Sequence, residues 1–200
     1  MAMTTLDAAT HRAGAGREKV VAAALDLFAE RGVSATSLQM IADRLGVTKA
    51  AVYYHFKAKR DIVLAVVRPA LAELGAMVED TERERSQAVR TEQLLVGLVD
   101  LLIRNRRLYA ILEGDLAVAQ ILATDPLLAP LGERLVDALV GPDPDPGQIV
   151  AANLFLAGLK SVGAGGAADI PDAELRGYIL DCAHRLLRRR RQPTGRPAPS

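Results

Sequence analysis

Apolar residues recur at helical spacing near the start of the chain. We expect the first helix to end near Arg31, with Gly32 as its C-terminal stop. Its buried face, at positions i, i+3, i+4 and i+7, consists of Val21, Ala24, Leu25 and Phe28. Residues 1–16 are rich in Ala, Thr and Gly and show no such period, so we expect them to form a flexible arm.

Two short helices and a tight turn are predicted next. Ser37 can cap the free backbone amides of the first helix, and Gly46 can end it. The buried face of this helix consists of Leu38, Ile41, Ala42 and Leu45. Thr48 can cap the second helix, in which Val52 and Phe56 lie four residues apart on the buried side.

The rest of the chain continues the helical pattern, without any alternating strand pattern. A longer fourth helix is expected over about residues 59–78. Beyond it, proline-containing breaks separate further helices, and the last two are expected at about 146–164 and 171–190. Residues 191–200 are expected to form a flexible tail. The pattern therefore predicts an all-α fold of about nine helices.

Composition narrows the class of protein. The 200 residues are 50% hydrophobic and 24% charged, which is typical of a globular chain. The single cysteine, Cys182, cannot form an internal disulfide, and no apolar segment has the length of a signal peptide or membrane span. We therefore expect a cytoplasmic protein that does not enter a membrane. Residues 1–64 hold nine Lys or Arg against six Asp or Glu, which weakly favours a polyanionic partner for this part.

The two short helices and their glycine-containing turn are typical of a helix-turn-helix. The second helix of such a motif must be small and polar at its N-terminus to enter the major groove, which is about 12 Å wide. The residues in this place are Thr48, Lys49, Ala50 and Ala51. Hydroxyl and imidazole groups follow at Tyr53, Tyr54 and His55, where the helix would pass the phosphates.

The stretch from Arg17 to about Val66 resembles the DNA-binding domain of the TetR family of bacterial transcriptional regulators. The matching sequence is ALDLFAERGVSATSLQMIADRLGVTKAAVYYHFKAKRDIV. The resemblance implies a helix-turn-helix domain at 17–62, joined by the fourth helix to a ligand-binding and dimerisation domain at 63–190. It also implies a homodimer that binds a pseudo-palindromic operator in double-stranded DNA, usually represses, and is released by a small-molecule ligand.

The same resemblance implies which residues contact DNA. Base-edge contacts match Gln39, Lys49, Ala50, Ala51 and Tyr53, and phosphate contacts match Thr48, Tyr54, His55 and Lys59. Gln39 has the amide needed to pair with adenine, whereas the two alanines offer only apolar contact to a thymine methyl group. Tyr53 and Tyr54 could instead be core aromatics, but the helical wheel places them away from Val52.

The C-terminal part offers candidates for the effector site and the dimer interface. Tyr109, Glu113 and Asn153 are polar residues among apolar ones and could orient a ligand, although surface positions or helix caps are the alternative. The last two helices are predicted to form an isologous four-helix interface. Its apolar stripe on the final helix consists of Leu175, Ile179, Cys182 and Leu186.

No cofactor or metal site is expected. Cys182 and His184 are two residues apart, so on a helix they point to different sides and cannot share a metal. No set of serine, cysteine, histidine and carboxylate residues has the spacing of a hydrolase, which argues against an enzyme. The alternative to a regulator is a helical small-molecule-binding protein without sequence-specific DNA binding.

Overall fold

A computed structural model describes the backbone of residues 3–113, 115–125 and 129–187, and their side chains except 3–13, 112, 113, 117, 129 and 164. These residues form ten α-helices and a π-helical turn, η1, with no strand among them. The elements are α1 (Met3–Arg31), α2 (Leu38–Leu45), α3 (Lys49–His55), α4 (Lys59–Glu82), α5 (Gln87–Arg104), α6 (Arg106–Glu113), α7 (Leu116–Ala123), α8 (Ala129–Val140), α9 (Pro146–Ser161), η1 (Val162–Gly166) and α10 (Asp172–Leu187). The all-α prediction is confirmed.

The predicted caps of the short helices are also confirmed. The Ser37 hydroxyl accepts a hydrogen bond from the backbone N–H of Met40, and the Thr48 hydroxyl accepts one from that of Ala51. Gly46 ends α2 in the left-handed region at φ 65°, which glycine adopts without steric cost. Three local sequence features thus fix where α2 and α3 begin and where the turn between them lies.

The prediction of a flexible arm at residues 1–16 is wrong from Met3 onward, since α1 begins there. The amphipathic part of α1 supplies a nucleus, and each further residue then adds a backbone hydrogen bond. Alanine is the best helix former, and no proline interrupts the segment. Helix extension therefore needs no hydrophobic period in this part of the chain.

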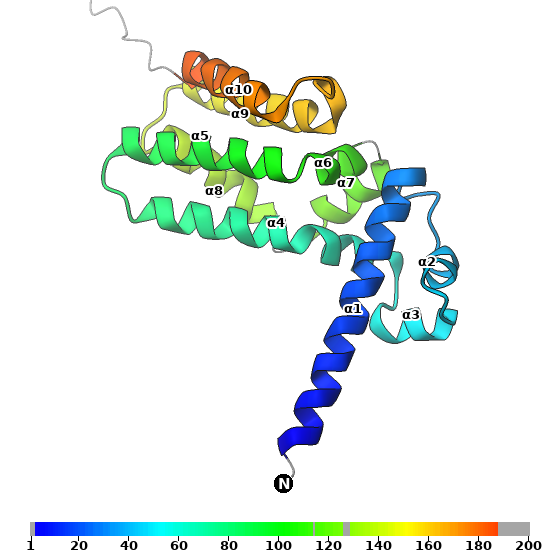
Figure 1. Cartoon of the computed structure of the whole chain (residues 1–200). Helices are drawn as coiled ribbons and strands as arrows, with labels where there is room; N and C mark the ends of the chain where they lie inside the picture. Colours follow the sequence, from blue (N-terminus) through cyan, green and yellow to red (C-terminus); the bar gives the residue numbers. More distant parts are fainter. Residues whose placement is uncertain (1–2, 114, 126–128, 188–200) are drawn as a thin grey trace, which may run out of the picture.

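Two hydrophobic cores lie along α4. The first joins α1, α2 and α3 to the start of α4 and also takes in Ile111 of α6 and Val118 of α7. The second is formed mainly by α5, α8, α9 and α10 around Val78, near the other end of α4. Figure 1 shows α4 running along the helical body while α1, α2 and α3 form a separate group at one of its ends. The fourth helix therefore links the two cores, as the sequence predicts.

The end of α9 differs from the prediction. The helix stops at Ser161, and η1 follows, with Gly165 at φ 121°. The backbone of Gly163 packs so closely on α5 and α6 that a Cβ there would lie 2.5 Å from a methyl carbon of Leu102 and 2.8 Å from Tyr109 Cβ. The predicted tail at 191–200, and the arginines at 188–191, lie outside the described residues.

Candidate nucleic-acid interface

Helix α3 is held in place by two buried side chains. Val52 is fully buried and Phe56 is 2% exposed, and both belong to the first core. Burying a side chain of this size contributes about 1.5–3 kcal/mol. Lys49, Ala50 and Ala51 at the other side of the helix are exposed. The first turn of α3 is thus small, free of bulky groups and open to a large partner.

The two tyrosines of α3 lie on its exposed side. Tyr53 is 49% exposed and Tyr54 is 72% exposed, so neither is the core aromatic that the alternative interpretation required. The Lys57 ammonium donates a hydrogen bond to the Tyr53 carbonyl oxygen at 3.0 Å and lies 5.0 Å from the centre of its ring. This arrangement holds a cation and a phenol side by side, next to the small residues of the first turn.

The structure places Gln39 on the exposed surface of α2, in the first turn of that helix. Its amide nitrogen donates to a carboxylate oxygen of Asp43 at 2.7 Å. An amide that pairs bidentately with adenine needs both its donor and its acceptor. Contact with a base therefore requires this exposed hydrogen bond to open.

Two of the predicted phosphate contacts are engaged inside the protein. The Lys59 ammonium donates to the carbonyl oxygens that follow α1, at Val33 (2.7 Å), Ser34 (3.0 Å) and Thr36 (3.0 Å). These bonds use all three of its hydrogens. The His55 ring is half-buried and packs against α1, where a Cβ on Gly16 would be 2.8 Å from its Nε2 atom. Thr48, by contrast, is exposed, and its hydroxyl caps α3.

Lys59→Met should therefore lower the stability of the DNA-free protein. We expect a loss of about 1.5–3 kcal/mol of unfolding free energy, because hydrogen bonds from a charged donor to three carbonyls disappear. Urea unfolding measures it, with Lys57→Met as the control, since Lys57 is exposed and makes one such bond. If Lys59 serves only to bind phosphate, unfolding will be unchanged and the salt dependence of DNA binding will fall by about one counterion.

An ion pair fixes α2 against α1. The Arg44 guanidinium donates to both carboxylate oxygens of Glu30, at 3.0 Å and 2.6 Å. This hydrogen bonding, together with the nearby positive charges, holds the pKa of Glu30 below its usual value. Bidentate pairing adds geometric precision to the angle between the two helices.

Two of the three predicted ligand residues, Tyr109 and Asn153, differ in their surroundings. Tyr109 is half-buried against the second core and touches η1 at Gly163. Asn153 is exposed on α9, and its amide donates to the Ile149 carbonyl one turn earlier, at 2.8 Å. The side chain of Glu113 lies outside the described residues. Of the two whose side chains the structure describes, only Tyr109 packs against the apolar core of the helical body.

The predicted dimer stripe mixes two faces of α10. Leu175 and Ile179 are 3% and 8% exposed and belong to the second core of the monomer, so assigning them to a subunit interface is wrong. Cys182 is exposed, and Leu186 is 41% exposed. Tyr178 lies one turn before Cys182 and is 57% exposed. Tyr178, Cys182 and Leu186 thus form an exposed row on α10, of which the sequence pattern did not indicate Tyr178. The side-chain period fits either row, so only packing separates them.

An apolar surface on α9 continues that row. Ile149, Val150 and Leu154 are 41%, 57% and 58% exposed. Helices α9 and α10 pack against each other in the second core, and Figure 1 shows them together on the side of the body away from α4. We refer to the set Ile149, Val150, Leu154, Tyr178, Cys182 and Leu186 as the α9–α10 face.

Two further kinds of site were sought in the described part of the chain. Among those residues, no group of three or more His, Cys, Asp or Glu side chains could hold a metal ion. No helix within the same residues has both the length and the apolar character needed to cross a membrane.

Residues 20–66 match the family model of bacterial regulatory proteins of the tetR family. The HTH-type transcriptional regulator SrpR of Pseudomonas putida is 43% identical over 51 residues, which are 26% of this chain and 24% of SrpR. The probable acrEF/envCD operon repressor of Escherichia coli K12 is 36% identical over 86 residues, 41% of this chain and 39% of that protein. The chain thus spans less than half the length of these curated relatives.

Solved structures extend the likeness to the whole fold. A transcriptional regulator from Aquifex aeolicus aligns with TM-score 0.64 and 18% identity over 83% of this chain and 96% of that one. The ketosteroid transcriptional regulator KstR2 of Mycobacterium tuberculosis aligns with TM-score 0.63 and 20% identity over 84% and 93%. The fold is therefore that of these solved structures, and the match to the tetR family model covers residues 20–66 of the chain.

Proposed function

We propose that this protein is a ligand-responsive transcriptional regulator, most simply a repressor, that binds a pseudo-palindromic operator as a homodimer in the cytoplasm. The exposed first turn of α3 carries this proposal. Its small side chains can approach base edges because Val52 and Phe56 fix the helix from behind. A binding protein without DNA recognition would have no use for such an exposed helix.

The proposed DNA contacts fall into two groups, contacts to base edges and contacts to phosphates. Lys49, Ala50, Ala51 and Tyr53 of α3 and Gln39 of α2 are all exposed and would face base edges. Thr48 and Tyr54 would contact the phosphates on either side. Lys59 and His55 would join them only after giving up contacts within the protein. We expect Lys57, which is exposed and follows α3, to supply a phosphate contact instead.

The α9–α10 face supports the homodimer. Its six members are apolar or only weakly polar and come from two adjacent helices, so a two-fold axis would bring four helices together. Ala157 and Gly158, which are also exposed on α9, permit close approach of the helices. Leu175 and Ile179 support this arrangement from inside the monomer.

Selection of binding sites from random duplex DNA tests the proposed function. The regulator should enrich one inverted repeat whose half-sites lie about one helical turn, or 34–36 Å, apart. A helical binding protein without operator recognition would enrich no sequence, and its binding would depend only on salt. The absence of an enriched sequence at low salt would refute the regulator.

Gln39→Ala should change specificity more than affinity. We expect a loss of about 1–3 kcal/mol at particular base pairs of the selected operator, because a bidentate contact to adenine is removed, with binding to random DNA unchanged. Competition binding with operators mutated at single positions measures this. Gln93→Ala is the matched control, since Gln93 is exposed on α5. Equal losses on operator and random DNA would contradict the assigned role.

A further inference from the structure

A pocket of about 480 Å³ lies where the helix-turn-helix domain meets the helical body. One wall is the end of α1 and the loop after it, and the other is α6 and the residue before α7. Phe28 and Ile111, which both belong to the first core, form an apolar floor with Ala29 and Ala110. The volume lies within the range of about 300–1,000 Å³ that small-molecule sites occupy.

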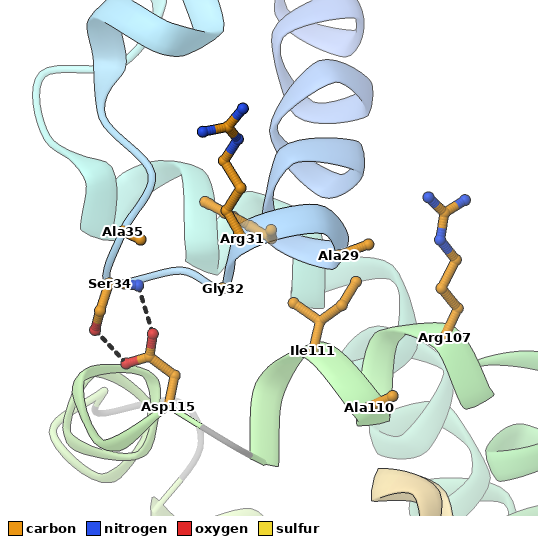
Figure 2. A pocket seen from close by; sticks show the side chains of 10 residues that line it. Ala29, Arg31, Gly32, Ser34, Ala35, Arg107, Ala110, Ile111 and Asp115 are labelled. Carbon is orange, nitrogen blue, oxygen red and sulfur yellow. Dashed lines mark hydrogen bonds between the residues drawn. The ribbon is translucent and has the colours of Figure 1, made fainter. Parts of the chain in front are cut away.

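One end of this pocket already binds a carboxylate. Asp115, just before α7, accepts hydrogen bonds from the backbone N–H of Ser34 at 2.5 Å and from its hydroxyl at 2.7 Å. Figure 2 shows both bonds converging on the Asp115 carboxyl group from the loop that follows Gly32. The Ser34 donors are thus arranged for two oxygens of one carboxylate. The group that they hold belongs to the other domain.

Two guanidinium groups stand at the rim of the same pocket. Arg31 makes no hydrogen bond or ion pair with any residue that the structure describes, and Arg107 pairs with Asp26 at 2.9 Å on the surface. Figure 2 shows their side chains extending in the same direction, on either side of Ile111. Glu30 is ion-paired with Arg44, and its carboxylate also attracts Arg31 and Arg107 electrostatically. An exposed ion pair such as Arg107–Asp26 contributes little and can open.

We propose that this interdomain pocket binds a small organic carboxylate with an apolar body, which displaces Asp115 from Ser34 and takes its charge partners from Arg31 and Arg107. The apolar body would lie against Phe28 and Ile111. A charged acceptor gains about twice as much as a neutral one from each hydrogen bond, and arginine suits carboxylates geometrically. The proposal deepens the proposed function by naming a ligand class and a site.

Displacement of Asp115 would remove a direct link between the helical body and the DNA-reading unit. Ser34 lies in the loop between α1 and α2, so its position affects how α2 is placed relative to α1. While Asp115 holds Ser34, the body fixes that loop. Once a free carboxylate replaces Asp115, the loop and α7 can move independently. The ligand then favours a state in which the helix-turn-helix is less well oriented for DNA. The size of this shift equals the difference between the ligand's binding free energies for the two states.

Isothermal titration of the full-length protein with benzoate and hexanoate tests this proposal, with benzamide as the uncharged control. Both carboxylates should bind the protein, and benzamide should not. Arg31→Ala should weaken binding about tenfold or more, because a charged partner is lost. Arg134→Ala is the control and should bind like the unaltered protein, since Arg134 is a half-buried arginine paired with Glu82 beside the other core.

Asp115→Ala distinguishes competition between Asp115 and the ligand from a purely structural role of Asp115. Removing the internal competitor should raise affinity for benzoate about tenfold, and in labelled protein benzoate should shift the Ser34 amide resonance. Circular dichroism verifies that the variant remains folded. The proposal is overturned if neither carboxylate binds, if Arg31→Ala and Arg134→Ala behave alike, or if Asp115→Ala gains no affinity. If the proposal fails but the same preparation selects an operator, the proposed function stands. If carboxylates bind but no operator is selected, the proposed function is refuted instead.

Discussion

Ala51→Glu should abolish specific operator binding, with a loss of at least about 100-fold, equivalent to about 2.7 kcal/mol. Ala51 is exposed on the first turn of α3, where the proposed interface places base edges. A carboxylate there would face the negative groove, and like charges brought together cost several kcal/mol. The helix itself should tolerate the change, because a negative charge near a helix N-terminus is favourable.

Electrophoretic mobility shift with the selected operator measures the loss, and thermal unfolding verifies the fold. Ala88→Glu is the matched control, because Ala88 is exposed in the first turn of α5, in the helical body. It introduces the same charge at a similar helix position, and we expect its operator affinity to stay within about twofold of the original. Equal losses in the two variants would indicate a general charge effect and contradict the role of α3.

Leu154→Asp should convert the dimer into monomers and reduce operator affinity by at least about 100-fold. Leu154 is 58% exposed in the single chain and lies within the α9–α10 face. An unpaired charge buried by the partner subunit costs about 3–5 kcal/mol. A monomer can occupy only one half-site and loses the gain from binding both together. Sedimentation velocity reports the oligomeric state.

Two comparison variants separate the interface from the core. Leu116→Asp changes a residue that is 75% exposed on α7, outside the α9–α10 face, and should remain dimeric. Ile179→Asp places a charge in the second core and should unfold the helical body instead of producing folded monomers. A Leu154→Asp protein that still sediments as a dimer would place the interface elsewhere.

The helix-turn-helix was predictable because its determinants are local. The Ser37 and Thr48 caps and the left-handed Gly46 each act within four residues along the chain, so the sequence displays them directly. The burial of Val52 and Phe56 follows from their helical spacing. The proposed DNA-facing residues of α3 then lie on the opposite side of the helix. Predicting them requires no knowledge of contacts between distant parts of the chain.

The features that escaped prediction depend on contacts between distant parts of the chain. Asp115 lies 81 residues from Ser34, and Lys59 lies 23 to 26 residues from the carbonyls that it binds. On α10, the period fits the rows through Ile179 and through Tyr178 equally well, and only packing against the second core decides which is buried. Side-chain periodicity has no information about either kind of contact.

Hydroxyl-radical footprinting of the selected operator tests most directly whether a dimer reads DNA through two copies of α3. The structure and the proposed α9–α10 interface predict two protected regions on one face of the duplex, about one helical turn or 34–36 Å apart and related by two-fold symmetry. Ala51→Glu should remove both protections together. A single protected region, or continuous protection around the duplex, would contradict binding by a symmetric helix-turn-helix dimer.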